Sequence, residues 1–181
     1  VGAGDQVDDL VHPHERDHEG DDQVRPQPPR EAELVLRAGG TALTGARIRD
    51  VQTDAAGNVV FAAKLGYPVD FGGGLIDFGS DEWNTVVVKL DGNGDFLWSH
   101  AYDNPDNAQL AVDPSGNVFI AGCFNGTLTV GPVPLVSAGD TDLFLAKLGP
   151  DGQPLWSKQY GDAGYQCYPG SGEVFVSADA S

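Results

Sequence analysis

The sequence predicts an all-β protein made of repeated units of four short antiparallel strands. Two observations carry this prediction. The string DAAGNV that begins at Asp54 returns as DPSGNV at Asp113, and the 181 residues include 25 glycines and 12 prolines. Recurrence at a fixed spacing indicates a repeat architecture, and so many Gly and Pro residues favour turns over long helices.

The repeat extends well beyond this one string. Its turn residues recur at an offset of 59, from Asp54, Gly57 and Asn58 to Asp113, Gly116 and Asn117. Seven further landmarks recur at an offset of 58, from Lys89, Leu90, Gly94, Leu97, Trp98, Ser99 and Tyr102 to Lys147, Leu148, Gly152, Leu155, Trp156, Ser157 and Tyr160. A weaker third copy begins at Ser171. We therefore expect two complete units and the start of a third.

Each unit is expected to begin with a hairpin. In LAVDPSGNVFIAG, residues 110–122, two apolar segments flank a turn that contains Asp113 and Gly116. The carboxylate of Asp accepts hydrogen bonds from backbone N–H groups two residues on. Gly adopts the positive φ that a bulged turn requires.

A second hairpin is expected to complete the unit. Residues 86–102 and 143–160 alternate apolar and polar positions up to a Gly-containing turn, and a strand carrying Trp98 or Trp156 follows. Four short strands match a blade of a β-propeller, so the fold class is a partial propeller of four-stranded antiparallel blades. The connection from Cys123 to Gly139 lengthens the unit, and its Gly and Pro predict an extended loop on one face.

The repeat resembles the bacterial seven-bladed β-propeller repeat family (SBBP). The resemblance is carried by D-x-x-G-N-V at Asp54 and Asp113, by DFGGG at 70–74, and by the closing K-L…G-x-x-L-W-S. It covers roughly residues 48–178 and implies blade units at about 48–107 and 108–164 with partial blades at both ends. The family also implies a secreted or cell-surface bacterial protein whose ligand is unknown.

The first 33 residues have a different character. They hold ten acidic residues, the Pro-rich string RPQPPR and no hydrophobic periodicity. Such a segment buries too little apolar surface to offset its ordering entropy, so residues 1–33 are predicted to be a disordered acidic tail or linker, and residues 34–181 the repeat segment. His12, His14 and His18 are interpreted as part of a solvated polar run.

Charge limits the classes of partner. The chain has 27 acidic and 10 basic residues, for a net charge of −17. Nucleic acid requires clustered Lys and Arg for its phosphates, so we expect no nucleic-acid partner. No stretch approaches the roughly 18 consecutive apolar residues of a membrane helix, so we expect no membrane insertion.

The two cysteines, Cys123 and Cys167, match no metal or redox spacing. Cys123 ends an apolar segment and Cys167 precedes another, so we expect unpaired small hydrophobes in two strands. A disulfide in an oxidising compartment is the alternative.

Asp91, Asn93 and Asp95 place oxygen ligands at alternate positions, as the first half of a calcium loop does. The match then fails, because Phe96 stands in place of the required Gly. A hairpin turn explains the run better, since turns favour Asp, Asn and Gly. We expect no cofactor, with weak Ca²⁺ binding left open.

Three tryptophans divide into two kinds. Trp98 and Trp156 occupy one repeated position, which favours packing between blades over a sugar-binding platform. Trp83 breaks the repeat and follows Asp81 and Glu82 in a polar segment, so these three residues are the best candidate for a binding contact.

No catalytic constellation is evident in the sequence. His100 is the only histidine of the repeat region, and neither a phosphate-binding glycine loop nor a G-x-S-x-G motif occurs. We therefore expect a non-catalytic scaffold or recognition module that binds protein or polysaccharide through its loops. Further blades of a parent chain, or self-association, would cover the end blades. The alternative is part of a propeller enzyme, a glycan hydrolase or lyase, with its site in the central channel.

Overall fold

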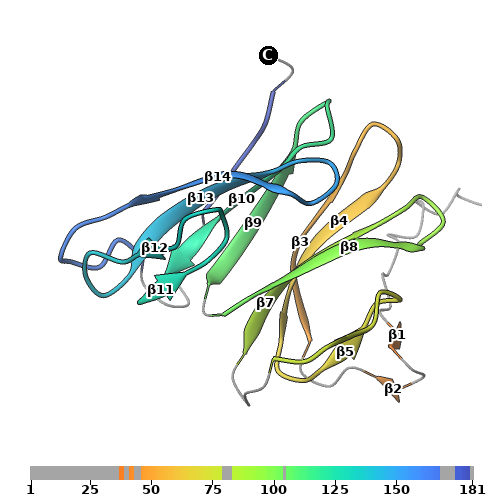
Figure 1. Ribbon diagram of the computed structural model, residues 1–181, viewed down its shortest axis with the longest axis horizontal. Helices are drawn as coiled ribbons and strands as arrows, with labels where there is room; N and C mark the ends of the chain where they lie inside the picture. Colours follow the sequence, from red (N-terminus) through yellow and green to blue (C-terminus); the bar gives the residue numbers. More distant parts are fainter. Residues whose placement is uncertain are drawn as a thin grey trace, which may run out of the picture. The chain divides into compact units, whose positions relative to one another are not determined.

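The computed structural model describes residues 37–38, 41–42, 46–78, 83–103, 105–167 and 174–179. All regular structure in these ranges is β-strand, arranged in antiparallel sheets of four or two strands (Figure 1). The predicted all-β fold class is confirmed. The disordered acidic tail or linker predicted at residues 1–33 lies outside the described part of the chain.

Two four-stranded sheets form successive blades with their strands in chain order. Blade 1 consists of β3 (Arg47–Thr53), β4 (Val59–Leu65), β7 (Asn84–Leu90) and β8 (Phe96–Tyr102). Blade 2 consists of β9 (Asp106–Val112), β10 (Val118–Phe124), β13 (Asp142–Leu148) and β14 (Pro154–Tyr160). This up-and-down order is that of a propeller blade, so the structure is a two-blade arc of a partial propeller.

A small hairpin interrupts the middle of each blade. It consists of β5 (Val69–Asp70) and β6 (Leu75–Ile76) in blade 1, and of β11 (Thr127–Leu128) and β12 (Leu135–Val136) in blade 2. The connection predicted as an extended loop is therefore partly paired, because its short apolar segments pack back onto the sheet. A further two-stranded sheet pairs β1 (Arg37–Ala38) with β2 (Thr41–Ala42).

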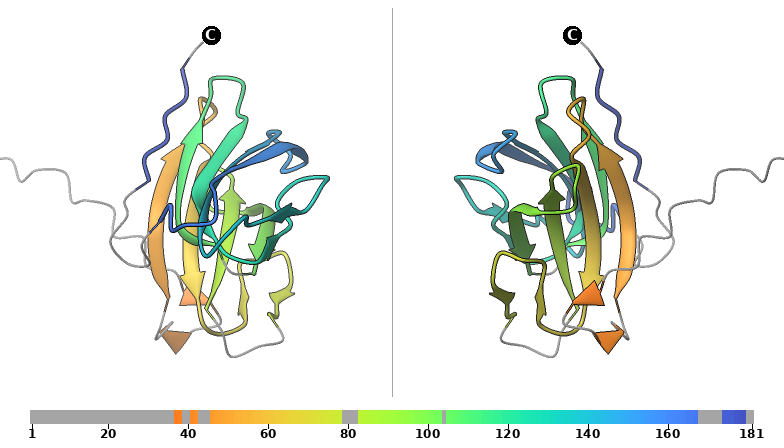
Figure 2. Two further views of the ribbon diagram at one scale, coloured as in Figure 1. Left: turned by 90° about the vertical axis from the view of Figure 1, so that its left-hand side faces the viewer. Right: turned by 90° about the vertical axis from the view of Figure 1, so that its right-hand side faces the viewer.

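The four turns that join β3 to β4, β7 to β8, β9 to β10 and β13 to β14 share one backbone hydrogen-bond pattern. In the first, Gly57 donates to Asp54 O at 3.0 Å and the Asp54 carboxylate accepts from the N–H of Asn58 at 3.0 Å. Gly57 has φ of 83° and its repeat partner Gly116 has 80°, values that other residues rarely adopt. The turns between β3 and β4 and between β9 and β10 lie at the same end of the molecule (Figure 2).

The main core lies between the blades. Blade 1 contributes Val60, Ala62 and Val87, and blade 2 contributes a larger set that includes Leu110, Val118, Ile120, Ala146 and Leu148. These side chains are almost fully buried, so each blade covers the facing side of the other. A second core in blade 1 packs Phe61, Val86 and Val88 against the small hairpin and its flanks, including Phe71 and Phe78.

The two cysteines form a disulfide, so the prediction of unpaired thiols is wrong. Cys123 of β10 bonds Cys167, which follows β14 and belongs to no strand. The repeat explains the bond, because Cys123 stands where blade 1 has Lys64. Lys64 Nζ donates to Pro105 O at 3.1 Å and lies 3.3 Å from the Asp106 carboxylate. In both blades the second strand is thus tied to the segment that follows the fourth.

The weaker third copy is described only over residues 174–179. Residues 174–179 form no strand, and Phe175 is largely exposed. The partial blades expected at both ends of the repeat segment stay a prediction.

Candidate functional site: the groove between the blades

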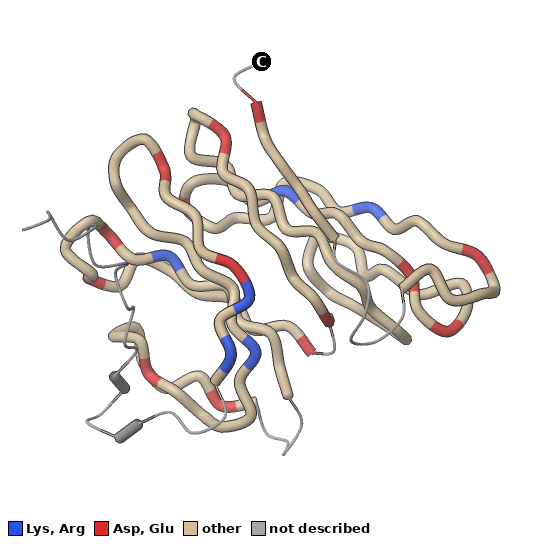
Figure 3. The backbone as a smooth tube through the Cα atoms, turned by 180° about the vertical axis from the view of Figure 1, so that it is seen from behind, with Lys and Arg blue, Asp and Glu red and all other residues tan. Residues whose placement is uncertain are grey.

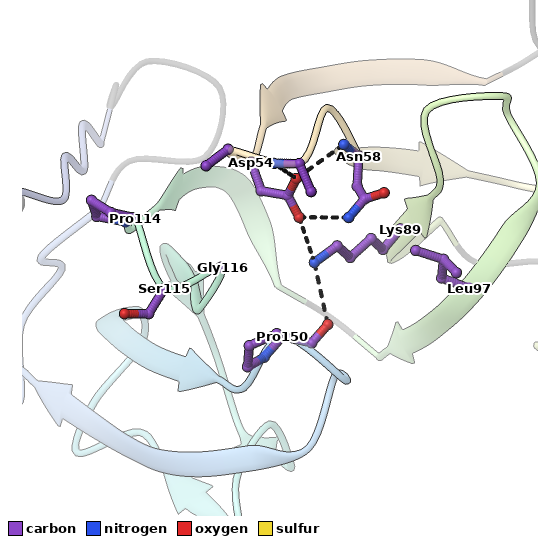
Figure 4. A pocket seen from close by; sticks show the side chains of 10 residues that line it. Asp54, Asn58, Lys89, Leu97, Pro114, Ser115, Gly116 and Pro150 are labelled. Atoms are coloured by element: carbon purple, nitrogen blue, oxygen red, sulfur yellow. Dashed lines mark hydrogen bonds and ion pairs between the residues drawn. The ribbon is translucent and has the colours of Figure 1, made fainter.

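An open groove of about 350 Å³ lies where the turns of blade 1 meet those of blade 2 (Figure 4). Asp54, Asn58 and Lys89 line it from blade 1, and Pro114–Gly116 and Pro150 line it from blade 2. The groove therefore joins residues that are far apart in the sequence.

Asp54 and Lys89 form a buried ion pair at the base of the groove. Lys89 Nζ lies 3.0 Å from Asp54 Oδ2, and the side chains are 3% and 6% exposed. Asn58 Nδ2 donates to the same carboxylate oxygen at 2.8 Å. Burial alone would raise the pKa of Asp54, but the hydrogen bonds from Asn58 and Lys89 outweigh it and lower that pKa to about 2.

Three side chains of blade 1 hold one turn of blade 2. Pro150 O accepts from Lys89 Nζ at 3.2 Å and from Trp98 Nε1 at 3.0 Å. His100 Nε2 lies 2.8 Å from Gly152 O and carries the proton of this hydrogen bond, since a carbonyl only accepts. We call Lys89, Trp98 and His100 the turn clamp. The side-chain nitrogens of the turn clamp are hydrogen bonded to backbone carbonyls of blade 2 and so join the two blades.

The same positions in blade 2 contact no further blade among the described residues. Lys147 Nζ pairs with Asp113 at 3.3 Å, and Asn117 lowers the pKa of that carboxyl by hydrogen bonding. Trp156 stacks edge-on to Phe119, and Lys158 Nζ lies 6.0 Å from the Trp156 ring. The repeated tryptophans thus differ, because only Trp98 packs against a core between blades.

The calcium candidates lie in the turn between β7 and β8. Asp91 Oδ1 accepts from the backbone N–H of Asn93 at 2.8 Å and of Asp95 at 2.9 Å. These hydrogen bonds lower the pKa of Asp91, the one from Asp95 most strongly. In the described ranges no three His, Cys, Asp or Glu side chains gather as a metal site.

Trp83 forms a separate surface at the opposite end of blade 1 from these turns. Its ring lies 5.6 Å from the guanidinium carbon of Arg47 and covers Gly66, where an added Cβ would meet the ring at 3.5 Å. Tyr67, the next residue, is 68% exposed, and Trp83 itself is 42% exposed. Asp81 and Glu82 lie outside the described residues. We call Arg47, Tyr67 and Trp83 the aromatic surface.

Several residues of the groove and of the aromatic surface were not identified from the sequence. Lys89 recurs in the repeat as Lys147, which was a usable signal for a structural cation. Pro150 acts through its carbonyl oxygen, and Arg47 reaches Trp83 from a distant strand. Neither relation has a local sequence pattern.

In the described part of the chain, no helix has the length and apolar character to cross a membrane. Comparison of the chain with models of known protein families and with curated protein sequences finds no match.

Proposed function

We propose that this chain is a non-catalytic recognition module that binds polysaccharide through the aromatic surface of blade 1. The carrying observation is Trp83, a large exposed ring fixed on the backbone of Gly66 beneath the Arg47 guanidinium. A pre-positioned ring loses little conformational freedom on binding, and Tyr67, the residue after Gly66, has a second exposed ring.

The charge of the chain favours a neutral glycan. The net charge of −17 repels acidic polysaccharides at long range, and acidic positions mark many of the turns (Figure 3). Arg47 is already placed over the Trp83 ring, where the cation–π contact restrains both side chains.

The roles of the polar groups support a non-catalytic module. The carboxylates of Asp54, Asp91 and Asp113 cap their own turns. His100 is hydrogen bonded to a backbone carbonyl of blade 2. A general acid or base needs access to substrate, and these groups are committed to the fold.

The setting we propose is a secreted or cell-surface bacterial protein whose repeats resemble those of the seven-bladed propellers. The Cys123–Cys167 disulfide supports an oxidising compartment, because disulfides persist outside the reducing cytosol. The family resemblance supports the bacterial surface.

The test is affinity electrophoresis and calorimetry with soluble neutral β-glucan and xylan, and with polygalacturonate as an acidic comparison. We expect a neutral glycan to bind and Trp83→Ala to weaken binding roughly tenfold or more. Leu155→Ala is the matched control, because it removes a similarly exposed apolar side chain on β14. Absence of binding to every glycan, or equal loss in both variants, would refute the proposal.

A further inference from the structure

The outer face of blade 2 repeats the face by which blade 1 contacts blade 2. At offsets of 58 or 59, Val60, Val87, Lys89, Trp98 and Tyr102 correspond to Phe119, Leu145, Lys147, Trp156 and Tyr160. The second set stays apolar and keeps its lysine and tryptophan. The chemistry that joins the blades is therefore present a second time.

In the described structure this second face is more exposed than the first. Tyr102 is 6% exposed and Tyr160 is 52% exposed. Lys89 is 3% exposed and Lys147 is 23% exposed. Val60 and Val87 are fully buried, whereas Phe119 and Leu145 are only partly buried. A partly exposed apolar face of this kind, on the side of the sheet opposite the core between the blades, is typical of a contact site.

Blade 1 offers a free turn that matches the one held by the clamp. In the turn 91–95, Gly94 donates to Asp91 O at 3.0 Å, as Gly152 donates to Gly149 O at 2.9 Å. Gly94 has φ of 90° and Gly152 has 83°. A Cβ at Gly152 would meet the Trp98 ring at 2.9 Å, whereas a Cβ at Gly94 would meet nothing within 4 Å. The turn in blade 1 therefore has the same backbone conformation, and no other group packs against its Gly94.

Charge favours contact between the free turn and the free face. The face carries Lys147 and Lys158, the latter where the clamp has His100. The free turn carries Asp91 and Asp95, where the clamped turn has Gly149 and Gln153. The outer face of blade 2 is thus more positive than the turn clamp, and the 91–95 turn is more negative than the 149–153 turn. The face and the 91–95 turn therefore carry opposite charges.

The described C-terminal residues lie against only part of this face. Ser177–Asp179 border a groove with Asp113, Phe119 and Lys147, at the place where Pro114–Gly116 of blade 2 border the groove between the blades. Trp156 and Lys158 do not line this groove. On the β14 half of the face, which corresponds to the half that holds Pro150 and Gly152, Lys158 and Tyr160 are exposed in the described structure.

We propose that the outer face of blade 2 binds the 91–95 turn of a second copy of this chain, so that copies associate head to tail. Trp156 and Lys158 take the roles of Trp98 and His100 toward the backbone carbonyls of that turn, and Lys158 attracts Asp95. The contact joins two different surfaces, so it closes into a ring or extends as a filament.

A charge-swap experiment tests this proposal on the full chain. Light scattering after size exclusion is measured over a concentration series for the wild type, Lys158→Asp and Asp95→Lys, with circular dichroism to verify folding. We expect the mass of the wild type to rise with concentration, and each variant to raise the dissociation constant at least tenfold. An equimolar mixture of the two variants should associate again, because it restores opposite charges at the contact.

Asp103→Lys is the control, since it makes the same change at an exposed carboxylate that follows β8. A wild type that stays monomeric at high concentration would overturn the proposal. Loss of association in Asp103→Lys as well, or no recovery in the mixture, would also overturn it. Glycan binding is measured separately, so failure here leaves the proposed function intact.

Discussion

Adding one methyl group at Gly152 should cost much more stability than adding it at Gly94. Both glycines have positive φ, of 83° and 90°, so alanine at either position pays the left-handed penalty of about 1 to 2 kcal/mol. Only at Gly152 does the new Cβ meet another group, 2.9 Å from the ring of Trp98 across the blade interface.

Overpacking of this kind costs about 1 to 3 kcal/mol more. We therefore expect Gly94→Ala to lower the free energy of unfolding by about 1 to 2 kcal/mol, and Gly152→Ala by about 2 to 5 kcal/mol. Urea unfolding followed by far-UV circular dichroism measures both values. If Gly152→Ala costs no more than Gly94→Ala, the turn of blade 2 is not held by blade 1 and the reasoning fails.

Three further predictions concern the ion pair, its titration and the disulfide. Lys89→Met should cost about 3 kcal/mol because it leaves Asp54 buried without its cation, and the more exposed Lys147→Met should cost under about 1 kcal/mol in the same urea assay. The folded pKa of Asp54, about 2, lies below its unfolded value of about 3.9. Its ionised form therefore stabilises the fold above about pH 4, by about 1 to 2 kcal/mol after solvent screening, and this is lost as the pH falls toward 2. Melting curves of the wild type and Asp54→Asn should converge over that range, and a constant gap would contradict the assignment. Cys123→Ala with Cys167→Ala opens a loop with a sequence separation of 44 and should cost up to about 4 kcal/mol by calorimetry, whereas an unchanged melting temperature would argue against the bond.

The framework of the blades was predictable because each repeated turn residue acts on neighbours that are close to it in the sequence. Asp54 and Asp113 cap turns with their own neighbours, and Gly57 and Gly116 supply positive φ there. Such contacts span at most four residues, so they leave a pattern that recurs with the repeat.

Other features depended on tertiary contacts and left no such pattern. The two-residue strands of the small hairpins are too short for alternation to be visible. Cys123 replaces Lys64 of the first blade, so the repeat itself concealed the disulfide. Trp83 was identified as exceptional, but its contact with Arg47 joins β3 to the residue that precedes β7, far along the sequence.

The most direct test of a two-blade arc with one covered and one open face is hydroxyl-radical footprinting of its paired tyrosines. Tyr102 and Tyr160 hold the same position in successive blades, at 6% and 52% exposure. In dilute protein we expect Tyr160 to be oxidised roughly tenfold faster than Tyr102, in proportion to the exposed area, as measured by mass spectrometry of the peptides. Equal rates would mean that blade 2 does not cover blade 1, and would contradict the shared core on which the account depends.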